Sequence, residues 1–269
     1  MRRSGIIFDL DGTVYLGDRL IPGAREIIEW LRRHEHPIVF VSNKPLQSRA
    51  DYAAKLSRLG VPTHPDEVIN SSLVLVRYLS REMPGATVYA VGEPPLLEEL
   101  ADARFGISEA PDEIEVVVAS FDRTFNYRKL NIAYQALRRG ARFFATNADA
   151  TCPVEGGEIP DAGAVIGALE GCSKRKVDLV VGKPSPLIVE VALEQLGRQA
   201  IECLMVGDRV ETDILMGQRA GMTTALVLTG VTRREDLAGA PVRPNHILES
   251  IGEVPKLFEN KTKNVIRDP

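Results

Sequence analysis

Residues 5–13 read Gly5-Ile6-Ile7-Phe8-Asp9-Leu10-Asp11-Gly12-Thr13, an apolar run that leads into two acids and a turn. An apolar run of this length that stops at Asp-Gly predicts a buried strand. Asp9 and Asp11 are two residues apart on extended backbone, so their side chains point the same way, with roughly 6 to 7 Å between Cα atoms. Carboxylates this close repel each other unless a proton or a cation intervenes. The stretch therefore predicts either a Mg²⁺ site completed by a phosphate oxygen or, as the alternative, a plain Asp-Gly turn.

Short β-branched runs alternate with amphipathic stretches along the chain, a pattern typical of an α/β fold with a parallel sheet. One helix is indicated by Ala24, Ile27, Ile28 and Leu31, which fall on a single face. Another has Pro186 at its first position and Gly197 past its end, and a third is expected over 212–220. We expect one sheet to contain the strands 5–8, 37–41, 177–181, 203–206 and 223–228.

A second set of elements lies between the strands at 37–41 and 177–181. It comprises predicted strands at 87–91, 116–119 and 142–145 and helices at 95–102 and 127–139. Leu130, Ala133, Tyr134 and Leu137 give the later helix an apolar stripe that can pack on its own sheet. We therefore predict a core formed by residues 1–79 and 179–269, interrupted by an inserted α/β domain over 80–178.

Polar residues follow three further strands of the predicted core. Ser42-Asn43-Lys44 ends one strand, and a hydroxyl followed by a backbone N–H suits an oxyanion, although an ordinary turn fits equally. Lys183 could face a phosphoryl group or simply face water. Asp208 could bind a metal, and Asp213 could brace it or Lys183, or merely favour a helix N-terminus. Carboxyl ends of parallel strands meet at one edge, so the set predicts a ligand site there.

Composition and charge exclude several other classes of protein. The chain has 269 residues and a net charge of −4, so a nucleic-acid polymer is not an expected partner. The apolar run before Asp9 is too short for a signal peptide or a membrane span, which indicates a cytoplasmic protein without a membrane partner. Three cysteines without a CxxC pair suggest reduced thiols. The four histidines have no ligand spacing.

The chain resembles the haloacid dehalogenase (HAD) superfamily of phosphatases in the order of its motifs. These are DxDGT, then Ser42, then Lys183, and then a Gly-Asp pair followed by Asp213. Within this superfamily, the chain is similar to subfamily IIA, the branch of the nitrophenyl-phosphatase-like, phosphoglycolate and pyridoxal-phosphate phosphatases and the nucleotidase of the N-acetylglucosamine operon. The strings at 120–130, 145–149, 160–163 and 182–184 extend the resemblance over nearly the whole chain. Ser42-Asn43 and the Ser-Arg-Ala string at 48–50 point towards sugar-phosphate phosphatases of this branch. The resemblance implies a Rossmann-like parallel-sheet core with an inserted α/β cap domain.

The resemblance also implies roles for the residues that match the family motifs. Asp9 would be the nucleophile, and Asp11 the general acid and then the general base. Mg²⁺ would be bound by Asp9, the Asp11 carbonyl and Asp208, with Thr13 and Asp213 in supporting positions. Ser42, the N–H of Asn43 and Lys183 would hold the phosphate oxygens.

In the cap, the resemblance nominates Asn147, Asp149, Cys152 and Pro153 as residues that reach the substrate. Two positions depart from the usual family pattern. Lys44 replaces an asparagine, and its extra cation could favour acidic or phosphorylated substrates or only face water. Cys152 stands where the pyridoxal-phosphate enzymes have a histidine, which argues against that substrate, and a buried apolar role for this thiol is equally compatible.

The expected function is Mg²⁺-dependent hydrolysis of small phosphate monoesters through an aspartyl-phosphate on Asp9. Sugar phosphates, phosphoglycolate, nitrophenyl phosphate and nucleotides are candidate substrates, acted on by a monomer or homodimer. A phosphotransferase or mutase would use the same intermediate but shield it from water. A dehalogenase would need neither Asp11 nor Mg²⁺. A metabolite sensor would have no need of a nucleophile beside an acid.

Overall fold

The computed structural model describes residues 4–154 and 156–258, and its backbone forms two compact units. The first unit comprises Met1–Val41, Ala53–Val68 and Ala192–Pro269. The second comprises Ser42–Tyr52 and Ile69–Val191. Each unit is built around a parallel sheet, which confirms the predicted α/β class. The predicted domain boundaries at 79/80 and 178/179 stay a prediction.

The first sheet has six strands in the order β15-β14-β13-β1-β4-β5. Their bounds are β1 Gly5–Asp9, β4 Ile38–Ser42, β5 Val68–Asn70, β13 Cys203–Gly207, β14 Thr223–Val227 and β15 His246–Leu248. β1 lies between β13 and β4 in parallel register, with Phe8 opposite both Val206 and Phe40. All five residues of β1 are buried, as expected for an apolar run at the centre of a parallel sheet. The strand predicted from residues 5–8 is therefore confirmed, and it ends at Asp9.

The helix predicted from its apolar face is α1 (Ala24–Arg33), with all four predicted face residues buried. It begins after Gly23, whose φ of 88° lies in the left-handed region. The helix expected over 212–220 is divided into a π-helical turn, Val210–Ile214, and α8 (Leu215–Arg219). Gly217 of α8 lets this helix approach β13 and β14, because an added Cβ would lie 2.6 Å from Thr224 and 3.0 Å from Met205.

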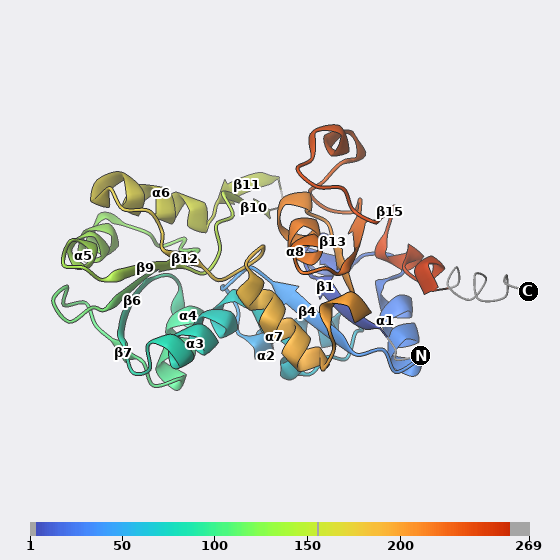
Figure 1. The fold of residues 1–269 in the computed structure, drawn as a ribbon, viewed down its shortest axis with the longest axis horizontal. Coiled ribbons are helices and arrows are strands. Elements are labelled where there is room, and N and C mark those ends of the chain that lie inside the picture. The colour runs from blue at the N-terminus through green and yellow to red at the C-terminus, as the bar shows by residue number, and fades with distance from the viewer. Residues whose placement is uncertain (1–3, 155, 259–269) are drawn as a thin grey trace, which may run out of the picture. The chain divides into compact units, whose positions relative to one another are not determined.

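The second sheet has five strands in the order β12-β9-β8-β6-β7. Its strands are β6 Thr87–Val91, β7 Gly106–Ile107, β8 Val116–Ala119, β9 Arg142–Ala145 and β12 Leu179–Val180. Helices α5 (Tyr127–Arg138) and α6 (Ala162–Ser173) pack on one face through a cluster that includes Ala133, Val117 and Phe143. α3 (Ser71–Glu82) covers the other face, where Tyr78 meets Phe144 edge-on, and α4 (Pro94–Asp102) lies beside it (Figure 1). The three strands predicted between 87 and 145 are confirmed.

The strand predicted at 177–181 was assigned to the wrong sheet. Leu179 and Val180 pair with Phe144 and Ala145 of β9, so this segment belongs to the second sheet. Asp178 secures the register, because its Oδ2 accepts a hydrogen bond from the Phe143 N–H at 2.8 Å and its own N–H donates to the Phe143 carbonyl at 2.7 Å. A strand of only two apolar residues can pair with the edge of either sheet, so the local sequence pattern did not indicate which sheet this strand joins.

The remaining elements are helices α2 (Arg49–Arg58) and α7 (Pro186–Leu196) and two small hairpins. The hairpins are formed by β2 (Tyr15–Leu16) with β3 (Arg19–Leu20) and by β10 (Thr151–Val154) with β11 (Gly157–Pro160). Among the described residues, every helix is too short or too polar to cross a bilayer.

Candidate active site

The first unit holds a buried cluster of three carboxylates, Asp9, Asp208 and Asp213. One oxygen from each lies within 4.8 Å of the other two. Asp9 is the last residue of β1, Asp208 directly follows β13, and Asp213 lies in the π-helical turn. β1 and β13 are adjacent and parallel, so their carboxyl ends carry Asp9 and Asp208 to the same edge. The structure brings together the two predicted metal-binding side chains and adds Asp213 to them.

Asp208 occupies a space lined by two glycines. A Cβ on Gly12 would lie 2.6 Å from Asp208 Oδ2, and a Cβ on Gly230 would lie only 1.9 Å from the same atom. The Val231 N–H donates to this oxygen at 2.6 Å, and the Thr229 hydroxyl donates to the Gly12 carbonyl at 2.6 Å. The Asp-Gly-Thr turn and the loop after β14 therefore enclose Asp208 from two sides.

Asp213 is held in a comparable way and is fully buried. Its Oδ2 accepts a hydrogen bond from the Arg209 N–H at 3.0 Å. A Cβ on Gly207 would lie 2.3 Å from the Asp213 Cβ, so only glycine leaves room for this side chain. Gly207 thus permits the close approach of Asp213 to the end of β13.

The donor set suits a hard divalent cation, since three buried carboxylates in one place require positive charge nearby. The hydroxyls of Thr13 and Thr212 are also buried and form no hydrogen bond within the described residues. Buried hydroxyls usually find a partner, which the hydration shell of an ion can supply. Thr13 adjoins Gly12 in the chain and Thr212 adjoins Asp213. The residues present therefore fit Mg²⁺.

Asp11 differs from Asp9 in its surroundings. It is half-buried, and its backbone forms an isolated bridge with Tyr15. The Tyr15 hydroxyl lies 3.5 Å from Asp11 Oδ2, at the limit of a hydrogen bond. The turn at 10–15 is closed by amides of Thr13, Val14 and Tyr15, which all donate to the Leu10 carbonyl. Asp11 is thus held on a hydrogen-bonded turn and stays partly accessible.

The second unit holds the predicted phosphate-binding residues Ser42, Asn43, Lys44 and Lys183. The Ser42 hydroxyl accepts a hydrogen bond from the Lys44 N–H at 3.2 Å. Asn43 and Lys183 are buried and directly connected, because Asn43 Oδ1 accepts from the Lys183 N–H at 2.7 Å. Lys44 is half-buried. A buried lysine is a strong electrostatic feature, since burial of an ammonium group costs free energy unless negative charge compensates it.

Two of the predicted cap residues, Asn147 and Asp149, follow β9 at the carboxyl edge of the second sheet, and the other two lie in a hairpin. Asn147 follows β9 and is fully buried, Asp149 is half-buried, and Cys152 and Pro153 lie in β10. Asn147 donates to Asp149 at 3.1 Å and to Asp161 at 3.0 Å. Burial raises the pKa of Asp161, while the hydrogen bond from Asn147 and the charge of Lys44 oppose that rise.

The same edge carries two ion pairs that the sequence did not predict. Glu93, after β6, is bound by Arg123 through two side-chain contacts of 2.7 and 2.6 Å and by its backbone N–H at 3.0 Å. The hydrogen bonds from Arg123 lower the pKa of Glu93. Lys129 donates to buried Asp122 at 2.6 Å. These charges are neutralised within the edge itself.

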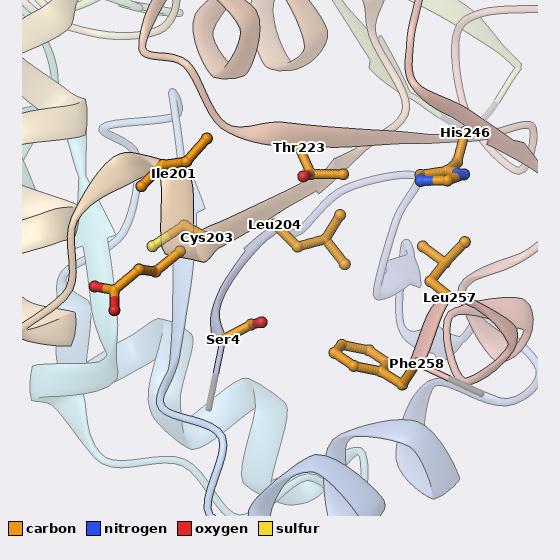
Figure 2. A pocket seen from close by; sticks show the side chains of 9 residues that line it. Ser4, Ile201, Cys203, Leu204, Thr223, His246, Leu257 and Phe258 are labelled. Atoms are coloured by element: carbon orange, nitrogen blue, oxygen red, sulfur yellow. The ribbon is translucent and has the colours of Figure 1, made fainter. Parts of the chain in front are cut away.

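A separate hollow of about 40 Å³ lies at the opposite edge of the first sheet. Its lining includes Ser4, Cys203, Thr223 and His246, from the amino ends of strands β1, β13, β14 and β15 (Figure 2). Ligand pockets for small molecules usually measure about 300–1,000 Å³. This hollow is therefore too small for a phosphorylated metabolite.

Sequence reasoning missed three parts of this arrangement: the loop 229–231 that holds Asp208, the amide of Asn43 that holds Lys183, and the Glu93–Arg123 pair. A signal existed for the loop, since Thr229-Gly230 follows a predicted strand of the same sheet. No local signal indicated the other two, because their partners are far apart in the chain.

Comparison with known proteins agrees with this geometry. A family model described as haloacid dehalogenase-like hydrolase matches residues 6–106, and a HAD-hydrolase-like model matches residues 180–254. The chain is 41% identical to the sugar-phosphatase AraL of Bacillus subtilis (strain 168) over 256 residues, covering 95% of this chain and 93% of AraL.

Solved structures agree with the sequence matches. The p-nitrophenyl phosphatase from Archaeoglobus fulgidus superimposes with a TM-score of 0.89 at 36% identity, covering 95% of this chain and 99% of that one. NagD from E. coli K-12 gives a TM-score of 0.86 at 33% identity, covering 94% and 99% of the two chains. The chain is therefore a haloacid dehalogenase-like phosphatase of the branch that includes NagD and the 4-nitrophenylphosphatases.

Proposed function

We propose that this phosphatase hydrolyses small phosphate monoesters with Mg²⁺, through an aspartyl-phosphate formed on Asp9. The observation that supports it most is the buried cluster in which oxygens of Asp9, Asp208 and Asp213 lie within 4.8 Å of one another. Asp9, Asp208 and the Asp11 carbonyl would hold the ion, with Asp213 and Thr13 supporting them. When bound, Mg²⁺ would neutralise charge on the phosphoryl oxygens so that an anionic nucleophile can approach.

In the first step, an Asp9 carboxylate oxygen forms a bond to phosphorus while the bond from phosphorus to the ester oxygen breaks. Asp11 gives its proton to that departing oxygen, so the leaving group departs as a neutral alcohol. Ser42, the Asn43 N–H and Lys183 bind the phosphoryl oxygens and stabilise their charge in the transition state. Asp11 is ionised at the end of this step.

In the second step, Asp11 takes a proton from water, whose oxygen attacks the phosphorus of the acyl phosphate. The bond to Asp9 breaks, which releases inorganic phosphate and restores both carboxyl groups. The half-buried position of Asp11 suits this double role, since it must meet both the leaving group and water.

The proposed substrates are sugar phosphates, phosphoglycolate, nitrophenyl phosphate and nucleotides. The names of the relatives, sugar-phosphatase and p-nitrophenyl phosphatase, support the first and the third. Asn147, Asp149, Cys152 and Pro153 are the cap residues proposed to lie near the leaving group, and Lys44 would favour a second anionic group. We expect the enzyme to act in the cytoplasm as a monomer or homodimer.

The test is phosphate release from nitrophenyl phosphate with and without Mg²⁺. Asp9→Asn should abolish release, Asp11→Asn should reduce it about 10²- to 10⁴-fold, and a chelator should stop it. Asp102→Asn, on an exposed acid at the end of α4, is the matched control and should retain full activity. Release by Asp9→Asn would exclude the aspartyl-phosphate.

The same assay separates the other possibilities. A mutase or phosphotransferase would move phosphate between sugar positions or molecules with little free phosphate. A sensor would bind phosphorylated ligands without turnover.

A further inference from the structure

The side-chain amide of Asn43 is fully used in binding protein groups. Its Oδ1 accepts from the Lys183 N–H at 2.7 Å. Its Nδ2 donates to the Lys183 carbonyl at 3.2 Å and to Asp149 Oδ2 at 3.0 Å. One oxygen and two N–H groups therefore make three hydrogen bonds, which fixes the orientation of the amide. The side chain of Asn43 holds the backbone of Lys183 on both its N–H and its carbonyl.

Gly182 makes this contact possible. A Cβ at this position would lie 2.7 Å from Asn43 Oδ1 and 2.5 Å from the Thr146 carbonyl. The Gly182 N–H itself donates to that carbonyl at 2.8 Å. The backbone that carries Lys183 is therefore pressed between Asn43 on one side and the segment after β9 on the other.

Asp149 joins Asn43 to that segment. Its Oδ2 accepts from Asn43 Nδ2 at 3.0 Å and from Asn147 Nδ2 at 3.1 Å. Asn147 also donates to Asp161 at 3.0 Å, and Asp161 accepts the Ala162 N–H at the start of α6. A carboxylate acceptor strengthens such bonds relative to a neutral one. The chain of bonds thus runs from the N-terminus of α6 to the backbone of Lys183.

We propose that Asp149 is a positioning residue that holds Lys183 in place through the amide of Asn43. This inference rests on the proposed function of Lys183 and gives Asp149 a role other than contact with the leaving group. Without the carboxylate, Asn43 loses the partner of one N–H, and its hold on Lys183 weakens. Lys183 then binds the transferring phosphoryl group less well in the transition state, whatever alcohol the substrate carries.

The proposal makes a distinctive kinetic prediction for Asp149→Ala. Its kcat should fall on the order of ten- to a hundredfold, by the same factor for nitrophenyl phosphate and for a sugar phosphate, with little change in KM. Asp149→Asn keeps an acceptor oxygen and should recover most of the loss. A residue that touched the leaving group would instead affect the two substrates unequally, and that result would overturn the proposal.

A second measurement does not depend on activity. The Lys183 amide proton should exchange with solvent about tenfold faster in Asp149→Ala, because the acceptor on Asn43 is less firmly held. Asp236→Asn is the matched control, since exposed Asp236 also accepts a backbone N–H, from Arg233 at 2.8 Å, but belongs to the other unit. It should change neither Lys183 exchange nor kcat. Unchanged Lys183 exchange in Asp149→Ala would refute the proposal.

A charge exchange keeps the test decisive if Asp149→Ala fails to fold. Asn43→Asp alone sets two carboxylates against each other where the nitrogen and oxygen now lie 3.0 Å apart. Adding Asp149→Asn removes the repulsion between the two carboxylates, although an oxygen then faces the Lys183 carbonyl. We therefore expect kcat to recover in part relative to Asn43→Asp, and no recovery at all would contradict the coupling. If the wild-type protein released no phosphate at all, the proposed function would fail while the exchange measurement still tested the link to Lys183.

Discussion

Gly230→Ala is expected to damage the acidic cluster without touching any of its carboxylates. The added Cβ would lie 1.9 Å from Asp208 Oδ2, whereas real Cβ contacts are not shorter than 3.0 Å, so the two atoms must separate by about 1.1 Å. Asp208 cannot simply retreat, because Gly12 encloses it on the other side and the Val231 N–H binds the same oxygen at 2.6 Å. The variant must therefore displace Asp208, the loop, or both.

The size of the effect follows from that displacement. Misplacement of a catalytic group by about 1 Å costs on the order of 10²-fold in rate, and overpacking of this kind costs about 1–3 kcal/mol of stability. We expect kcat/KM for nitrophenyl phosphate to fall about 10²-fold and the Mg²⁺ concentration for half-maximal activity to rise. Both are measured in a titration of Mg²⁺ at fixed substrate, with thermal unfolding recorded to establish that the variant is folded.

Gly167→Ala provides the matched control. Gly167 is exposed on α6, and apart from its chain neighbours and the backbone of its own helix no atom lies within 4 Å of an added Cβ. This variant should keep full activity and gain up to about 1 kcal/mol in stability from the better helix propensity of alanine. A folded Gly230→Ala protein with the wild-type rate and the wild-type Mg²⁺ requirement would refute the account of how Asp208 is held.

Two further predictions concern titration and thiol chemistry. Arg123 lowers the pKa of Glu93, so the ion pair stabilises the fold at pH values above the ordinary carboxyl pKa, and this stability is lost as the pH falls through the lowered pKa. Urea unfolding should therefore show Glu93→Gln destabilised by about 1 kcal/mol at pH 7 but little at acid pH. Equal destabilisation at both pH values would contradict it. Burial raises the pKa of Cys203 to about 11, and Cys152 is also buried, whereas Cys172 is exposed. At pH 8 a disulfide reagent should therefore modify Cys172 fast and the other two thiols slowly. Rapid modification of all three in the folded protein would disprove that burial pattern.

The helices and strands whose buried side chains recur at a regular spacing could be predicted from the sequence alone. The buried strand ending at Asp9, the helix with Ile27 and Leu31 on its inner face, and the strands between 87 and 145 all follow from spacing alone, because burial of one face imposes a period on the residues. The strand around Leu179 was assigned to the wrong sheet for the complementary reason. This strand pairs with β9 of the second sheet, and its apolar residues would suit the edge of the first sheet equally well.

The sequence by itself determined that two carboxylates follow a central strand and that Asp208 ends another, since residue type and strand position are local properties. The tertiary structure decided what surrounds them: glycines at 12 and 230 that make room for Asp208, Asp213 within the cluster, and an amide at 43 that holds Lys183 from 140 positions away. Such contacts depend on which backbones approach each other in space. No periodicity along the chain encodes that, because each partner alone is compatible with many surroundings.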